Sequence, residues 1–377
     1  MDERKKKIWK ELTSRPEFFN YDSTLTTTQL RINGDTPSFL GLPIAWEAKE
    51  LEGADIVFVG FPWEGLRHET PSTWLTAGPR SVDPESIMSR GSADQAPTWI
   101  RQNSIRYSFH IGGGYFMETG PDFILMDNFK MFDYRDVEIK EWDVEESARR
   151  AIDKVADIVK AGAIPLVLGG DHSTPYPIVR AISDNSEGKI GIICFDAHYD
   201  SMYGGSFPYP HGDFGRLNCG NAFYKIFDTC QSEPENMVFI GVKEGGAYNT
   251  PLMHKLAQEL EMTIFTSTDV EQMGMETVVN KAIEVASKGT DKIYVSLDAD
   301  SLDPVEFPAQ KATDPFGLPT RQVVEALKII SRDTNLAGFD LVCMAPAYDI
   351  KGVSALTSCK FFIEILKGLA IKKMGKK

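Results

Sequence analysis

The sequence predicts an α/β fold with a mainly parallel sheet and helices on both of its faces. Short runs such as IPLVLGG and KIGIICFDAH are apolar throughout, and from about residue 145 such runs alternate with helical patterns. Strands that are apolar on both faces and separated by helices are typical of parallel sheets covered on each side. A hydrophobic fraction of 42% with 25% charged residues is that of a globular protein with a sizeable core.

The expected elements follow one another along the chain. ADIVFVGFPW is the first strand, and EESARRAIDKVADIVKAGA is a helix whose apolar residues recur at helical spacing until Gly162. Helical patterns also cover about 250–261, 269–288 and 320–332, and a last helix lies near 354–373. The later strands are IPLVLGG, KIGIICFDAH, NMVFIGV, MTIFTS, DKIYVSLDAD and LAGFDLVCMAP.

The remaining parts of the chain are less regular. Residues 64–125 are rich in Gly, Ser, Pro and aromatic residues, and we expect long loops with short helices there. HIGGGYF (110–116) lacks the Lys and the helix that follow a phosphate loop, so it predicts a flexible turn. We expect residues 1–50 to form an arm with one short helix that contacts other subunits. Residues 51–377 then form one domain that carries the site.

Composition excludes several classes of function. The chain has 40 basic and 54 acidic residues, and its formal charge of −14 argues against a nucleic-acid partner. The same charge permits attraction of small cationic molecules. There is no apolar run long enough for a membrane span. Five scattered cysteines without a CxxC pair predict a reducing compartment, with the cytoplasm as the expected location.

Three of the expected strands run into acidic residues and histidines. Ligand sites of open α/β sheets lie beyond the carboxyl ends of the strands, so these side chains should share one edge of the sheet. Residues at i and i+2 of an extended segment face the same side, which groups the members of each cluster. The six residues are His172 after the first of these strands, Asp196, His198 and Asp200 after the second, and Asp298 and Asp300 after the third.

Four carboxylates and two imidazoles that converge would repel one another unless cations lay among them. Alone, a DH pair after two glycines is most often a helix cap, and DxHxD or DxD is common in loops and turns. Together, at three strand ends, they indicate two divalent ions that share a water. Carboxylate and imidazole ligands without thiolate favour Mn, Ni, Fe or Co over a structural zinc site.

These residues also resemble a known family. GGDHS (169–173), FDAHYD (195–200) and SLDADSLDP (296–304) are similar to the three signature motifs of the ureohydrolase superfamily, the arginases and agmatinases. The likeness covers roughly residues 50 to 370. It implies a three-layer αβα sandwich, assembly into trimers or hexamers, and a dinuclear metal centre. The metal is manganese in most members of the family and nickel in the guanidine-hydrolase branch.

The resemblance also implies a role for each site residue. One ion would be held by His172, Asp196, Asp200 and Asp298. The other would be held by His198, Asp196, Asp298 and Asp300, so that Asp196 and Asp298 bridge the two ions.

Hydroxide formed between the ions would attack the guanidinium carbon and release urea or a urea derivative with an amine or ammonia. Asp300 would accept the proton. His211, in SFPYPHGDFGRL, would protonate the leaving group or hold the substrate, and its alternative is a loop histidine packed among aromatic rings.

Two departures from the family pattern bear on the substrate. The segment VEFPAQKATDPFGLPT (305–320) replaces the usual APGTGTP sequence, and Cys343 stands where a glutamate usually pairs with the guanidinium group. The residues that contact the α-amino and α-carboxylate groups of arginine in arginases have no recognisable counterpart in this sequence. With the long N-terminal arm, this favours hydrolysis of guanidine, an alkylguanidine or a biguanide such as metformin, with nickel favoured and manganese the alternative.

Other interpretations stay open. An agmatinase or guanidinobutyrase-type enzyme is the first alternative. Cys343 and the altered loop also suit a subunit that supports a heteromeric hydrolase, instead of a homo-oligomer. A deacetylase with one zinc ion is disfavoured because His198 and Asp300, the ligands of a second ion, are retained.

Overall fold

The computed structural model describes residues 4, 6–7, 37–64, 92–107, 113–114, 116–120, 122–140, 143–200, 217–243 and 249–375. In this part of the chain eight strands form one sheet in the order β2-β1-β3-β8-β7-β4-β5-β6, and all neighbouring strands are parallel. The strands are β1 (Ile56–Gly60), β2 (Met131–Asp136), β3 (Ile164–Leu168), β4 (Ile190–Phe195), β5 (Met237–Val242), β6 (Thr263–Thr266), β7 (Lys292–Asp298) and β8 (Leu336–Val342).

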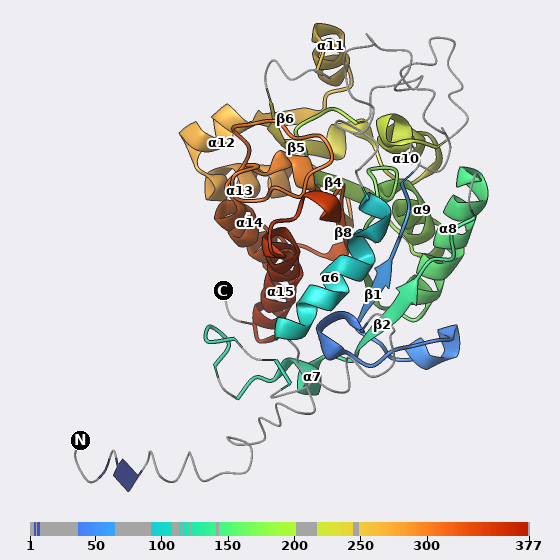
Figure 1. Ribbon diagram of the computed structural model, residues 1–377. Coiled ribbons are helices and arrows are strands. Elements are labelled where there is room, and N and C mark those ends of the chain that lie inside the picture. Colours follow the sequence, from blue (N-terminus) through green and yellow to red (C-terminus); the bar gives the residue numbers. More distant parts are fainter. Residues whose placement is uncertain are drawn as a thin grey trace.

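Helices cover both faces of this sheet, as Figure 1 shows for α13, α14 and α15 on one side and α8 and α9 on the other. The first face carries α6 (Ala96–Ser104), α12 (Ser267–Met273), α13 (Met275–Ala286), α14 (Thr320–Asp333) and α15 (Val353–Lys373). The second carries α8 (Val144–Lys160), α9 (Pro175–Asn185), α10 (Ala222–Thr229) and α11 (Pro251–Glu259). The expected three-layer α/β fold with a parallel sheet is therefore confirmed.

The two cores follow from the alternation of side chains along each strand. In β1, Ile56 and Phe58 pack into the core beneath α6 and α15, whereas Val57 and Val59 pack into the core beneath α8. Every residue of β4 and β5 is buried, which explains why these strands are apolar throughout.

The helix expected over 269–288 is divided into α12 and α13. Gly274 joins them with a φ of 81°, a positive value that a glycine adopts without steric cost. A helical hydrophobic pattern continues through both pieces, so the pattern alone does not reveal the break. The helix α6 lies within the region expected to contain short helices, and a further short helix, α7 (Leu125–Asn128), begins at the last residue of that region.

Strand β2 was not among the strands expected from the sequence. Its MFDYRD segment carries three charged residues, and its alternation of apolar and polar residues is short. The strand is stabilised by a buried ion pair, because the Arg101 guanidinium donates to both carboxylate oxygens of Asp133, at 2.8 and 3.0 Å. A charged residue that is buried with a partner interrupts the apolar pattern by which a buried strand is recognised in the sequence.

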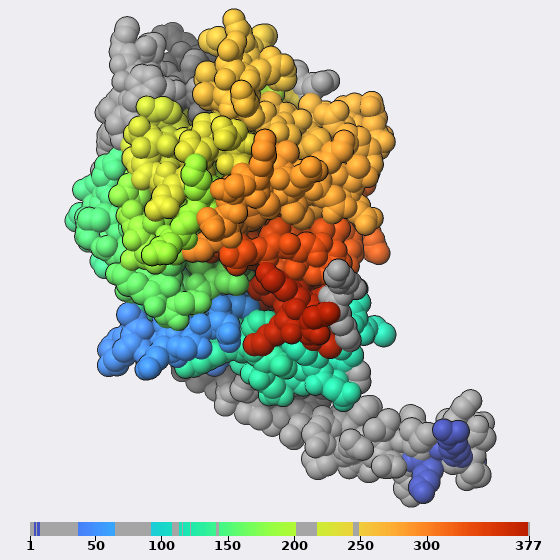
Figure 2. All heavy atoms as spheres, turned by 180° about the vertical axis from the view of Figure 1, so that it is seen from behind, coloured from blue at the N-terminus to red at the C-terminus, as the bar shows by residue number. Residues whose placement is uncertain are grey.

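Residues 37–50, counted with the arm in the sequence analysis, pack against the domain. The ring centroids of Phe39 and Phe58 lie 4.6 Å apart, and the Phe39 backbone N–H donates to the Asp133 carboxylate at 2.7 Å. Figure 2 shows residues 37–64 (blue) beside segments drawn in teal. The contact of the arm with other subunits stays a prediction.

None of the helices in the described part of the chain combines the length and the apolar character that crossing a lipid bilayer requires.

Candidate metal centre

The six residues singled out in the sequence all lie at the carboxyl edge of the sheet. His172 follows β3, the cluster Asp196–Asp200 follows β4, and Asp298 ends β7. The turn after β3 requires its glycines because a Cβ at Gly170 would lie 2.0 Å from the Trp63 carbonyl oxygen. The absence of side chains there lets the backbone pass close to Trp63 and carry His172 into the buried edge.

Three carboxylates surround one nitrogen of His172. Its Nδ1 lies 3.0 Å from an oxygen of Asp196, 3.0 Å from one of Asp200 and 3.2 Å from one of Asp298. Each of the four residues can direct one ligand atom to a common point, since these atoms lie within 4.8 Å of one another. These are the four residues that the resemblance assigns to one ion.

A second group forms around His198. Its Nδ1 lies 3.2 Å from Asp300 Oδ2 and 3.7 Å from Asp196 Oδ1, and these three residues also converge within 4.8 Å. Asp300 is held in place because its Oδ1 accepts from the Ala197 backbone N–H at 3.3 Å.

Asp196 connects the two groups. Its Oδ2 faces His172 and its Oδ1 faces His198, so one carboxylate presents an oxygen to each group. Asp298, the other residue expected to bridge, belongs to the His172 group alone. Its Oδ1 accepts from the Asp300 backbone N–H at 2.9 Å. The bridging role of Asp298 therefore stays a prediction.

The donor set fits divalent cations. The Asp196 Oδ2 atom is buried and makes no hydrogen bond with any described residue, although it lies close to His172. One imidazole N–H cannot donate to three carboxylates, so hydrogen bonding alone does not explain the His172 group. Ligand atoms at right angles around an ion with bonds of about 2.1 Å lie about 3.0 Å apart, which matches the observed spacing.

The electrostatics also call for positive charge. Burial, followed by the charge of Asp200, raises the pKa of Asp196 well above its usual range. Burial and the charge of Asp300 likewise raise the pKa of Asp298. Burial would lower the pKa of His198, but the neighbouring Asp300 outweighs it and raises that pKa to about 10. Buried acids and bases that shift in this way are typical of functional sites.

Behind His172 lies a chain of hydrogen bonds that the sequence analysis did not identify. His172 Nε2 lies 3.1 Å from Ser296 Oγ, which donates to Asp340 Oδ1 at 2.7 Å. The hydroxyl of Tyr294 donates to the other oxygen of Asp340. This arrangement fixes the ring so that Nδ1 faces the carboxylates. Partners of this kind orient a ligating histidine.

Replacing Ser296 with alanine is expected to weaken metal binding by about 10- to 100-fold, because His172 loses the partner that holds its ring. The measurement is metal content after dialysis against graded chelator. Ser331→Ala is the matched control, since Ser331 is also buried but bonds only to carbonyls of α14. Equal metal retention in both variants would contradict the orienting role of Ser296.

Two further described residues near the site were also missed. Lys243, at the carboxyl end of β5, donates to the Asp300 carbonyl oxygen at 3.0 Å and is buried. Ligand sites of open α/β sheets lie beyond the carboxyl ends of the strands, and this rule could have identified Lys243 as well. Lys311, in the 305–320 segment, forms an ion pair with Glu64, and no spacing in the sequence links these two residues.

Cys343 lies directly after β8, between the strands that lead to His172 and Asp298. It is buried and has a φ of 58°, a conformation that is uncommon for residues other than glycine. Burial raises the pKa of its thiol well above the usual range. His211, the remaining residue singled out in the sequence, lies outside the described residues.

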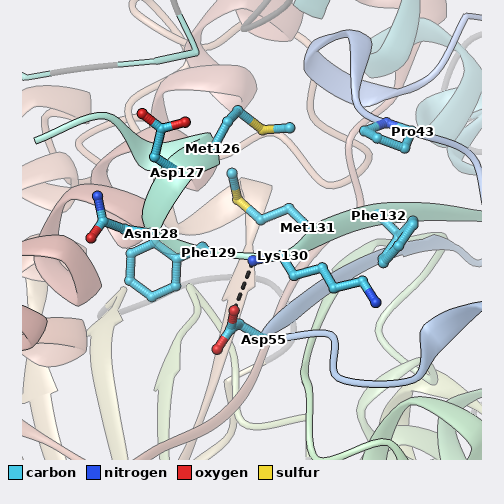
Figure 3. Close-up of a pocket in the computed structure, with 9 residues that line it drawn as sticks. All are labelled: Pro43, Asp55, Met126, Asp127, Asn128, Phe129, Lys130, Met131 and Phe132. Carbon is cyan, nitrogen blue, oxygen red and sulfur yellow. Dashed lines mark hydrogen bonds between the residues drawn. The ribbon is translucent and has the colours of Figure 1, made fainter.

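The cavity in Figure 3 is separate from this edge. It has a volume of about 370 Å³ and lies where β1 and β2 begin. There the Lys130 backbone N–H donates to Asp55 at 2.7 Å. The amino ends of parallel strands lie opposite the edge that carries the six residues. None of the six lines this cavity.

Comparisons with known proteins agree with these observations. The model of the arginase family matches residues 54–367. Formimidoylglutamase of Halalkalibacterium halodurans is 28% identical over 317 residues, which cover 84% of this chain and 92% of the relative. Mitochondrial agmatinase of Gallus gallus is 29% identical over 330 residues, 87% of this chain and 84% of the relative. The crystal structure of Trypanosoma cruzi formiminoglutamase with Mn²⁺ shares the fold at a TM-score of 0.68 and 19% identity, with 89% and 99% of the two chains covered.

Proposed function

The chain belongs to the arginase family, and on this premise we propose that it hydrolyses a C–N bond of a small guanidino compound with the help of two divalent ions. It is a hydrolase of C–N bonds in linear amidines, as its named relatives are. The proposed substrates are guanidine, an alkylguanidine or a biguanide such as metformin. The observation that carries the proposal is the position of Asp196, whose two oxygens face two separate groups of ligands.

The proposed chemistry assigns a task to each side chain. Two divalent ions held by these residues would supply hydroxide at neutral pH. Asp300 is buried beside His198, which lowers the pKa of its carboxyl although burial opposes this. An ionised Asp300 can accept the proton that water loses and pass it to the departing amine. His172 and Asp200 would serve as metal ligands throughout the reaction.

The substrate preference is inferred from Cys343. A thiol whose pKa is raised by burial carries no charge at neutral pH, so it cannot pair with a guanidinium group as a glutamate would. This supports small or alkylated guanidino groups over agmatine. Nickel is the favoured metal and manganese the alternative. The manganese in the T. cruzi structure supports a dinuclear site without deciding between the two metals.

A substrate panel tests the proposal. Protein loaded with nickel or with manganese is assayed for urea and amine release from guanidine, methylguanidine, dimethylguanidine, metformin, agmatine, 4-guanidinobutyrate and formimidoylglutamate. We expect the highest kcat/KM with a guanidino compound that lacks a charged substituent. Failure of fully metal-loaded protein to cleave any of these compounds would contradict the proposal, and highest activity on agmatine would favour the agmatinase alternative.

Cys343→Glu is expected to shift preference towards unsubstituted guanidinium substrates by about tenfold in relative kcat/KM, because it restores a charged partner for the cation. Cys343→Gln is the control, since it has nearly the same shape without the charge. The measurement is kcat/KM for guanidine, dimethylguanidine and agmatine with each variant. An unchanged substrate profile in Cys343→Glu would place residue 343 outside the pocket.

A further inference from the structure

A buried ion pair lies beside Cys343. Lys311 Nζ is 3.0 Å from Glu64 Oε1, and the two side chains are only 9% and 2% exposed. The second oxygen of Glu64 accepts from the Ala93 backbone N–H at 3.1 Å, which fixes the carboxylate. Two long charged side chains are thus held at one place in the interior.

The backbone places this pair next to Cys343 and the turn that leads to His172. Lys311 N–H donates to the Cys343 carbonyl oxygen at 3.2 Å, and Gln310 pairs with Met344 in an antiparallel bridge. Cys343 N–H in turn donates to the Gly170 carbonyl oxygen at 2.7 Å, two residues before His172. Lys311 also belongs to the 305–320 segment that departs from the family pattern.

The surroundings connect the pair to the site. The Lys311 ammonium interacts electrostatically with the carboxylates of Glu64 and Asp171, and the thiols of Cys343 and Cys219 lie nearby. The carboxylate of Asp171 already accepts hydrogen bonds from the Ser173 backbone N–H and hydroxyl at 3.1 and 2.6 Å. Among the described residues, Glu64 is therefore the direct ion-pair partner of Lys311.

Two charges that pair with each other attract a charged group of the substrate less than a single unpaired charge does. While Glu64 and Lys311 bind each other, neither is available for a charged group of the substrate. A charged substituent placed beside them would lose its water without gaining a partner. Removing one member leaves the other buried and unpaired, and that residue then attracts a substituent of opposite charge.

We propose that the Glu64–Lys311 ion pair sets substrate specificity by favouring guanidino compounds whose substituents carry no charge. This inference rests on the proposed function and adds the residues that select the substrate. Agmatine, with an ammonium substituent, and 4-guanidinobutyrate, with a carboxylate, are both disfavoured relative to methylguanidine.

Two substitutions are expected to change the selectivity in opposite directions. Lys311→Met leaves the Glu64 carboxylate unpaired and raises kcat/KM for agmatine relative to 4-guanidinobutyrate by about tenfold or more. Glu64→Gln removes the direct ion-pair partner of the ammonium and lowers the same ratio by a similar factor. The double variant Glu64→Gln/Lys311→Met has no unpaired charge and is expected to return to the wild-type ratio.

Controls separate selectivity from stability. Lys328→Met removes a lysine that pairs with Glu325 on α14, away from the site, and should leave the ratio unchanged. Metal content and thermal unfolding are measured for every variant. If a single variant does not fold, a double variant whose ratio differs tenfold from wild type overturns the proposal. Folded single variants with the wild-type ratio overturn it as well.

Binding distinguishes failure of this inference from failure of the proposed function. Calorimetric titration of the metal-loaded wild type, Lys311→Met and Glu64→Gln with agmatine and 4-guanidinobutyrate reports selectivity for any compound that binds without being cleaved. Opposite shifts in affinity support the inference even if the wild type cleaves none of the compounds. Loss of affinity for every guanidino compound in Glu64→Gln would overturn it, because Glu64 would then contact the guanidinium group itself.

Discussion

Asp196→Ala is expected to lose both metal ions and to lower kcat/KM for the best guanidino substrate by more than about a thousandfold, since water without the two ions supplies almost no hydroxide at neutral pH. The physical reason is the position of its carboxylate, which presents one oxygen to the His172 group and the other to the His198 group. Elemental analysis of the purified variant gives the metal content, and the substrate assay gives kcat/KM.

Asp153→Ala is the control for this experiment. Asp153 is an exposed carboxylate on α8 paired with Arg149, and its removal should leave the metal content unchanged. Asp298→Ala provides a second comparison. It should lose both ions if Asp298 bridges and only the ion of the His172 group if it does not. Full metal occupancy in Asp196→Ala would contradict the linking role of that residue.

Arg101→Met is expected to lower the free energy of unfolding by about 3–5 kcal/mol, because it leaves the buried Asp133 carboxylate without its charged partner. Both side chains are inaccessible to solvent, and the guanidinium contacts Asp133 through two nitrogens. Asp133 also accepts from the Phe39 backbone N–H, so the loss extends to the segment that precedes β1. Urea unfolding followed by circular dichroism measures the effect.

Arg149→Ala is the matched control for Arg101→Met. Arg149 pairs with Glu146 and Asp153, but its side chain is 59% exposed, so solvent screens the interaction. We expect no resolvable change in the free energy of unfolding. If Arg101→Met were no more destabilising than this control, the buried ion pair would not hold β2 and α6 together.

Much of this fold can be predicted from local patterns in the sequence. Strands β3, β4, β5, β7 and β8 are apolar runs flanked by helical segments, and a parallel sheet with buried faces explains that pattern. The site was predictable for a related reason. His172, Asp196 and Asp298 follow directly from such strands, so the rule that parallel strands direct their carboxyl ends to one edge brings them together.

What could not be predicted depends on pairs of residues distant in sequence. Glu64 and Lys311 are buried as partners, yet each alone resembles a solvated surface charge. Arg101 and Asp133 are also buried as partners, and the charge of Asp133 makes β2 difficult to recognise as a strand in the sequence. Ser296 is an ordinary strand residue until the fold places it against His172. Burial of polar groups is favourable only with a partner, and sequence spacing does not name that partner.

The strand order also has a consequence for how this protein acquires its structure. β8 (Leu336–Val342), the last of the described strands in sequence, lies between β3 and β7, which lead to His172 and Asp298. These two ligands can meet only after β8, which follows both β3 and β7 in sequence, has been inserted between them. Such long-range pairing slows folding. Metal capture is therefore expected to follow the synthesis of β8, and a nascent chain that stops before residue 336 should not retain the ions.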